Sequence, residues 1–183
     1  MNNHNEFIPA VNISPILPPE DEFQLDFEIL DCVVMSDKHA QVAIITDNEI
    51  DRDALEIGEN SRVVFSTFSK YPYLCVHLKN VEKFMSITVA CKCENDLIRE
   101  LTFSNRRSNV HIHGNTLSAP LIISDGWQYV NIDLNKVLLN GFGVKFISCL
   151  EVVIDGSTRV SKMFLQEQEY ADAELPPYLR MIQ

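Results

Sequence analysis

The sequence has no long apolar run. No stretch approaches the roughly 18 consecutive apolar residues that a membrane-spanning helix needs, so we expect no span and no membrane partner. The opening residues, MNNHNEFIPAV, have neither the basic region nor the apolar stretch of a secretory signal. Because the five cysteines are an odd number at low density, we expect reduced thiols in the cytosol rather than a disulfide framework.

The sequence motifs of common enzyme classes are also missing. There is no G-x-S-x-G elbow, no catalytic-cysteine signature, no Walker loop and no G-x-G-x-x-G. The triplet Gly141-Phe142-Gly143 follows an apolar segment and is typical of a helix end. Carboxylates are plentiful between residues 20 and 60, but without flanking aromatic residues they are more typical of a solvated surface than of a glycosidase cleft. We therefore expect a protein that is not an enzyme and needs no cofactor.

Positive charge is scarce, since the formal net charge is −11 and the pI is about 4.8, which argues against a nucleic-acid partner. The charge is also unevenly distributed. Residues 1–60 hold 14 acidic side chains against Lys38 and Arg52, whereas residues 61–166 carry a net charge of +4. This asymmetry indicates two differently charged surfaces; the simpler alternative is charge that only keeps the protein in solution.

Apolar residues make up 46% of the chain, enough for a real core, and most of them alternate with polar ones. Because a period of two is typical of half-buried strands, the pattern predicts about ten strands with no βαβ rhythm. We expect an all-β fold, an antiparallel jelly-roll-like β-sandwich, with turns at Asp125-Gly126 and Asp155-Gly156. The clearest stripes begin at Phe23, Met85, Leu97, Val130 and Phe146.

The length of 183 residues fits one domain with two extensions. Four prolines make residues 1–20 an extended arm, whose apolar residues we expect in a groove of this chain or of a partner. Residues 21–166 form the sandwich, including a short helix from Asp133 to Asn140. In residues 167–183 we expect a helix over Glu167–Leu175 and a tail that packs on the domain. The apolar arm residues that we expect to bind are Phe7, Ile8, Ile16 and Leu17.

Three constellations could carry chemistry. Cys91-x-Cys93 and His111-x-His113 have ligand types that suit zinc, but their neighbours place the two pairs on opposite sides of their sheets, which favours structural roles. Trp127 follows a turn, where it could stack on a sugar or anchor the core. A set of basic residues could bind an acidic partner or simply be solvated: Lys79, Lys83, Lys92, Arg99, Arg106 and Arg107.

Several segments together resemble the cilia- and flagella-associated protein 20 family of axonemal proteins. The similarity covers about residues 45–180 and rests on the order and spacing of five motifs rather than on any one of them. The motifs are Ile45-Thr46-Asp47-Asn48 with Leu55-Glu56-Ile57, Leu78-Lys79-Asn80-Val81-Glu82-Lys83-Phe84, Phe103-Ser104-Asn105 with Pro120, Asp125-Gly126-Trp127, and Tyr170-Ala171-Asp172-Ala173-Glu174-Leu175-Pro176.

The resemblance implies a structural β-sandwich of the cytoskeleton at the inner junction of ciliary doublet microtubules, where the B-tubule meets the A-tubule. It implies tubulin, a Parkin co-regulated gene product-like protein and other microtubule inner proteins as partners. The chain departs from the family by being acidic, and by having Glu100, Leu101 and Thr102 where family members continue a run of arginines. A diverged paralogue in the centriole wall or basal body is therefore an alternative, as is a soluble sugar- or peptide-binding module.

Overall fold

Eleven strands and one short α-helix form the computed structural model, which describes residues 10–19, 25–36 and 41–181. The helices are α1 (Leu134–Phe142) and three single 3-10 turns, η1 (Glu94–Asp96), η2 (Asp172–Glu174) and η3 (Pro177–Leu179). The predicted all-β class is confirmed. The strands are β1 (Ile13–Leu17), β2 (Cys32–Ser36), β3 (Val42–Asp47), β4 (Arg52–Ile57), β5 (Ser61–Ser69), β6 (Tyr73–Cys93), β7 (Ile98–Ser104), β8 (His111–His113), β9 (Thr116–Pro120), β10 (Gly126–Asp133) and β11 (Phe146–Gln166).

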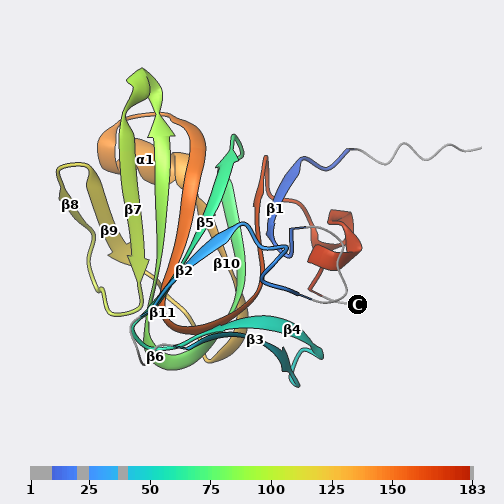
Figure 1. Cartoon of the computed structure of the whole chain (residues 1–183). Helices are drawn as coiled ribbons and strands as arrows, with labels where there is room; N and C mark the ends of the chain where they lie inside the picture. Colours follow the sequence, from blue (N-terminus) through green and yellow to red (C-terminus); the bar gives the residue numbers. More distant parts are fainter. Residues whose placement is uncertain (1–9, 20–24, 37–40, 182–183) are drawn as a thin grey trace, which may run out of the picture.

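Two 21-residue strands, β6 and β11, form the frame of the molecule. They pair antiparallel from Phe146 opposite Cys93 to Gln166 opposite Tyr73, and both turn at the bottom of the view in Figure 1. Above the turn they belong to a first layer with strand order β2-β5-β11-β6-β7-β9-β8. Beyond the turn they continue into a second layer, in which β10 pairs with β6, and β1 and β4 pair with β11. The sandwich is therefore a single sheet folded over on itself, with β3 added outside β4.

Gly156 forms the corner at which β11 passes between the layers. Its φ of +88° is a conformation that residues with a side chain rarely adopt. On the neighbouring strand, Met85 is opposite Gly156 and Asn80 is opposite Thr158, so four residues of β6 (81–84) have no counterpart and bulge outward. The expected turn at Asp155-Gly156 is therefore wrong as a strand boundary, because it bends one continuous strand.

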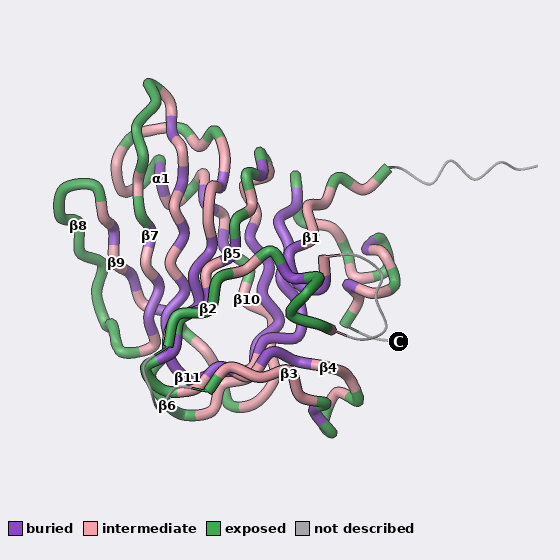
Figure 2. The backbone as a smooth tube through the Cα atoms, in the orientation of Figure 1, coloured by how far each residue is buried: buried purple, intermediate pink, exposed green. Residues whose placement is uncertain are grey.

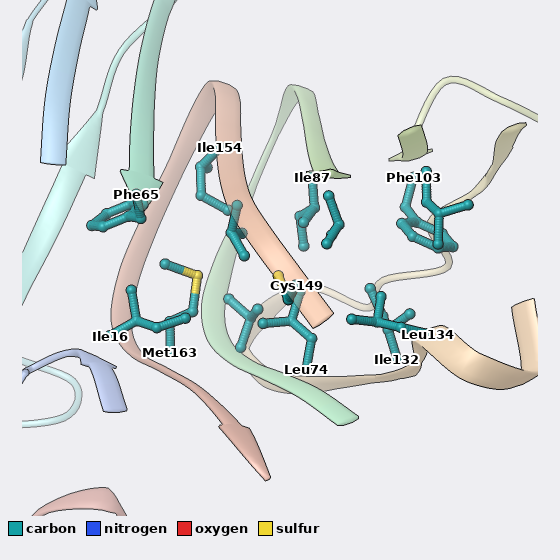
Figure 3. Packing of buried hydrophobic residues seen from close by; sticks show 14 of the residues in the cluster. Ile16, Phe65, Leu74, Ile87, Phe103, Ile132, Leu134, Cys149, Ile154 and Met163 are labelled. Atoms are coloured by element: carbon teal, nitrogen blue, oxygen red, sulfur yellow. The ribbon is translucent and has the colours of Figure 1, made fainter. Parts of the chain in front are cut away.

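The main hydrophobic core lies between the two layers. Side chains from the first layer, such as Phe65, Ile87 and Ile154, face Leu74 and Ile132 of the second (Figure 3). Figure 2 shows the buried residues gathered along the middle of the strands. Helix α1 contributes two leucines, Leu134 and Leu138, to the same core. Asp133 caps its N-terminus, since its side chain accepts a hydrogen bond from the backbone N–H of Lys136, and Gly143 caps its C-terminus.

The structure corrects several details of the sequence prediction. The alternation that begins at Phe23 does not mark a strand: residues 27–29 form a turn in which Phe27 and Ile29 are exposed, while residues 23 and 24 lie outside the described residues. One strand pair, β7 with β9, is parallel rather than antiparallel. The α-helix expected over Glu167–Leu175 is reduced to the single turn η2.

Both extensions of the chain lie on the second layer. Strand β1 pairs with the end of β11, and its residues Ile16 and Leu17 are buried in the main core. After β11, Leu175 and Leu179 pack with Phe164 and Cys75 in a small second cluster on the outer side of that layer. No helix in the described residues has both the length and the apolar character needed to cross a bilayer.

Candidate partner-binding site at the sandwich corner

Three loops meet at the corner where β6 and β11 turn: the β6 bulge (81–84), the loop after β7 (105–107) and the loop before β10 (121–125). Hydrogen bonds connect them, because the backbone N–H of Leu121 donates to the carbonyl of Ser104 (2.9 Å) and the Asn80 amide donates to the carbonyl of Ser124 (3.1 Å). We refer to these three loops as the tip. Segments from three of the five motifs noted in the sequence, those that begin at Leu78, Phe103 and Asp125, therefore lie beside one another.

Asn105 holds the bulge in shape. Its Oδ1 accepts a hydrogen bond from the backbone N–H of Met85 (3.1 Å), and its Nδ2 donates to the carbonyl of Lys83 (2.7 Å). Asn80 supports the other end of the bulge, since its Oδ1 accepts from the backbone N–H of Glu82 (2.9 Å). Both asparagines satisfy backbone groups that the strand ladder leaves unpaired at the bulge, so their role is to position the residues between them.

The tip presents apolar side chains next to cations. Ile122 is 92% exposed, the highest value among the exposed large hydrophobic residues of the described chain, and Phe84 is partly exposed. The guanidinium of Arg106 lies over the Phe84 ring, 5.2 Å from its centroid. Arg107 is exposed, and no side chain in the described residues pairs with its guanidinium. Apolar groups beside arginine are typical of the residues that dominate protein–protein interfaces.

The charges at the tip are balanced. Lys83 forms an ion pair with Glu59 (2.9 Å), from the turn between β4 and β5. The hydrogen bond and the positive charge of Lys83 lower the pKa of the exposed Glu59 carboxyl. Glu82 and Asp125 are also exposed here, so three acids accompany the cations of Lys83, Arg106 and Arg107. The tip is thus a mixed surface rather than a basic patch.

A cleft of about 480 Å³ lies between the bulge and β4. Its charged walls are already neutralised, because Lys83 pairs with Glu59, and Arg159 pairs with Glu56 (2.7 Å) and with Asp47 (2.7 Å). Glu59 is the acid of these walls whose pKa is shifted, and the shift is downward, which keeps the carboxyl ionised beside Lys83. Walls with paired charges of this kind can accept a polar side chain of a partner.

The remaining basic residues that the sequence singled out lie elsewhere. Lys79 is on the second layer, where it pairs with Glu49 (2.5 Å) and lies 3.6 Å from Asp47. Lys92 pairs with Asp96 (2.8 Å) beside the β6–β7 turn. Arg99 donates to Asn115 and lies over the ring of Phe142, 4.7 Å from the centroid. The six residues therefore do not form one cluster, and only Lys83, Arg106 and Arg107 are at the tip.

The arm residues are also separated from the tip. Ile16 and Leu17 are buried in the core of this chain, which leaves them no surface for a partner and corrects that part of the prediction. Phe7 and Ile8 lie outside the described residues.

The two residue pairs considered as zinc ligands differ in burial. Cys91 and Cys93 are buried in the core, whereas His111 and His113 are exposed on the edge strand β8. Burial raises the pKa of the Cys91 thiol, so it stays protonated and hydrophobic. In the part of the chain that the structure describes, no three histidine, cysteine or acidic side chains are grouped in a way that could hold a metal ion.

Trp127 is half-buried on the outer side of the second layer. Its indole N–H donates to Asp47 Oδ1 (3.3 Å), and its ring lies against His77 with the centroids 4.9 Å apart. The imidazole is in turn stacked with Tyr129 at 4.8 Å. Trp127 thus supports the second layer, with one ring face against a neighbour and its only polar group engaged.

Sequence reasoning found the cations of the tip but missed its two asparagines and Ile122. Asn80 and Asn105 are part of the motifs, but a motif alone does not show that their side chains bond to the same bulge. The available signal for Ile122 was an apolar residue two positions before the Ser124-Asp125-Gly126 turn, where burial is difficult.

Comparison with known proteins shows which family the chain resembles. The model of the CFA20 domain matches residues 24–183. The chain is 25% identical over 154 residues to Cilia- and flagella-associated protein 20 of Paramecium tetraurelia, covering 79% of this chain and 81% of that protein. It is 24% identical over 147 residues to the Chlamydomonas reinhardtii protein of the same name, with coverages of 75% and 77%.

Among solved structures, a family 11 carbohydrate-binding module from Clostridium thermocellum in complex with a mixed-linked tetrasaccharide is similar at 12% identity and a TM-score of 0.43. That similarity covers 89% of this chain and all of the module. The family match extends from the turn before β2 to the end of the chain and includes every loop of the tip. The chain belongs to the CFA20 domain family.

Proposed function

We propose that this chain is a structural, non-enzymatic protein of cilia or flagella, located at the inner junction where the B-tubule of a doublet microtubule meets the A-tubule. Two relatives that match over most of their length are named cilia- and flagella-associated proteins. The proposed partners are tubulin, a Parkin co-regulated gene product-like protein and other microtubule inner proteins. An interaction role also agrees with the cleft beside the tip, whose charged groups are paired with one another.

The observation that carries the proposal is the convergence of three motif segments at the tip. Asn80 and Asn105 hold the bulge, and the bulge holds Lys83 and Phe84 beside Arg106. Motif residues that shape an exposed apolar and cationic surface are more useful to a binding protein than to an enzyme. We propose the tip as the contact with tubulin, with Ile122 and Phe84 at its centre and Arg107 at its rim.

A tagged chain expressed in a flagellated cell tests the proposal. We expect the unmodified chain along the whole axoneme, and we expect Ile122→Asp combined with Arg107→Glu to become diffuse. The matched control is Ile98→Asp combined with Lys145→Glu, which makes the same change of charge at two exposed positions near the β6–β7 turn, away from the tip, and should be retained. Both changes are at exposed positions, so the purified variants should keep the thermal stability of the parent chain.

Three outcomes contradict the proposal in different ways. Signal confined to the basal body would move the protein to the centriole wall. Diffuse signal from the unmodified chain would mean that the family fold serves another role. Full retention of the tip variant would remove the tip as the contact, even if the axonemal location is correct.

A further inference from the structure

Strand β2 is an open edge of the first layer. Within the described residues, Cys32–Ser36 pairs only with β5, from Cys32 opposite Phe65 to Ser36 opposite Ser61. In an antiparallel ladder, alternate residues point their N–H and C=O groups away from the neighbouring strand. The free side of β2 therefore offers unpaired backbone donors and acceptors. In Figure 1, β2 is the light blue strand near β5.

This edge is also apolar and unprotected. Val33, Val34 and Met35 are 61%, 41% and 54% exposed. Open edges are usually blocked by a lysine, a proline or a very short strand, and the sequence CVVMS contains neither residue. The opposite edge of the same layer is shorter and more polar, because β8 has only three residues and two of them are histidines.

The apolar character continues inward from the edge. Val33 is opposite Val64 of β5, and Val64 is opposite Val153 of β11, so three valines lie in a row on the outer face of the first layer. Exposure falls along the row, since Val64 is half-buried and Val153 is buried. A strand added beside β2 would cover the exposed end of this row and gain apolar contacts in addition to backbone hydrogen bonds.

The charge near β2 selects the kind of strand that fits. Residues 25–36 contain Asp26, Glu28 and Asp31 and no lysine or arginine. The cation beside Met35 is Arg62, which is already paired with Asp155 at 2.6 Å. A second copy placed by two-fold symmetry would bring two such acidic segments together, which repulsion disfavours. A basic segment is complementary.

From this edge we infer a second binding surface, separate from the tip: β2 accepts an extended segment of a partner protein in which apolar and basic side chains alternate. The segment adds a strand to the first layer, with its apolar side chains on the outer face beside Val33 and Met35, and its basic side chains give it the positive charge that the acidic residues 26, 28 and 31 attract. Backbone hydrogen bonds supply much of the affinity, and the acidic surroundings supply the selectivity.

The test uses the full chain, amide NMR and two synthetic peptides, one alternating lysine with valine and one alternating glutamate with valine. We expect the lysine peptide to shift the β2 amide signals and to slow their hydrogen exchange, and the glutamate peptide to do neither. Val33→Lys with Met35→Lys should weaken binding at least about tenfold, because it places charge on the apolar edge. Val110→Lys with Ile112→Lys, at the exposed β8 edge, is the matched control and should bind as the parent does.

Each alternative result overturns the inference. Equal binding of both peptides would remove the charge argument, and shifts at β8 or at the tip would place the site elsewhere. Absence of binding, or undiminished binding by the Val33→Lys, Met35→Lys variant, would show that β2 is not the acceptor. Sedimentation as a dimer that the same variant dissociates would identify a second copy as the occupant. None of these results depends on the ciliary role.

Discussion

A Cβ atom on Gly156 would lie 2.3 Å from the carbonyl oxygen of Phe84. The two residues are on β11 and on the β6 bulge, so this close backbone approach is what allows the sheet to fold over. Contacts under 3.0 Å are not seen for real Cβ atoms, and the atom that would be struck is backbone rather than a flexible side chain. The positive φ of Gly156 adds a second reason for glycine at this corner.

Gly156→Ala should therefore destabilise the domain by about 3 kcal/mol or more, because it combines a clash with an unfavourable φ. The free energy of unfolding in urea measures the loss. Gly114→Ala is the matched control, since Gly114 also has a positive φ (+57°) but has open space around its Cα, so only about 1 kcal/mol is expected. Equal losses for the two variants would show that the approach to Phe84 is not what constrains the corner.

Asp47 is a buried carboxylate that stabilises the second layer. Burial opposes its ionisation, but hydrogen bonds from Arg159, the Glu49 backbone N–H and Trp127, with the charge of Lys79, outweigh it and lower the pKa of the carboxyl. A lowered pKa means stability that is present above the unfolded pKa of about 3.9 and lost as pH falls through the folded pKa.

Asp47→Asn should lower the free energy of unfolding by about 2 kcal/mol at pH 7. The difference in this free energy between variant and parent should become smaller in acid. Because Trp127 is the single tryptophan and bonds to Asp47, its fluorescence can follow urea unfolding at each pH. Asp155→Asn, which affects the more exposed ion pair with Arg62, should cost at most about 1 kcal/mol. A pH-independent difference for Asp47→Asn would contradict the ionic account.

His77 makes the fold sensitive to mild acid. Burial, and then the charges of Lys162 and Arg52, lower the pKa of its imidazole to about 4. The unfolded chain binds this proton already near pH 6.5, so stability should fall by up to about 3 kcal/mol between pH 6.5 and pH 4. His77→Phe keeps a ring between Trp127 and Tyr129 and should remove most of the loss of stability between about pH 6.5 and pH 4. Thermal unfolding at several pH values measures this. His111→Phe, at an exposed position, should leave the pH dependence unchanged.

Leu179 anchors the C-terminal segment. It is fully buried against Phe164 and Cys75, and its carbonyl accepts a hydrogen bond from the Tyr129 hydroxyl (2.9 Å). Leu179→Ala should cost about 2–4 kcal/mol in a urea titration. Met181→Ala, at an exposed position two residues further on, should stay within about 0.5 kcal/mol of the parent. No loss from Leu179→Ala would show that this segment is not part of the cooperative fold.

Much of the fold could be predicted because half-buried strands alternate. The stripe from Met85 to Cys91 lies on one buried face of β6, as its period indicates. The alternation near Phe27 predicts a strand equally well, but residues 27–29 pair with no strand among the described residues and form an exposed turn. The sequence Asp155-Gly156 is typical of a hairpin turn, yet here the strand continues through it. The close approach of Gly156 to the backbone of Phe84, which is distant in the sequence, is the feature that a local pattern does not contain.

The site was harder to predict, because the sign of a charge says nothing about its neighbours. Lys92 and Lys83 look alike in the sequence, yet one pairs beside a hairpin turn and the other lies on the bulge. Ile122 shows no periodicity that would distinguish it from a core residue. The position of Lys83 at the tip and the exposure of Ile122 depend on contacts between segments far apart in the chain, which local patterns do not contain.

The two long strands also determine how the protein can carry mechanical load. Because β6 and β11 run through both layers, a pull on the bulge passes along covalent backbone into each layer at once. The layers cannot slide apart unless a strand breaks or the ladder between β6 and β11 ruptures along much of its length. We therefore expect the domain to yield as one unit under tension, with no weak plane between its halves.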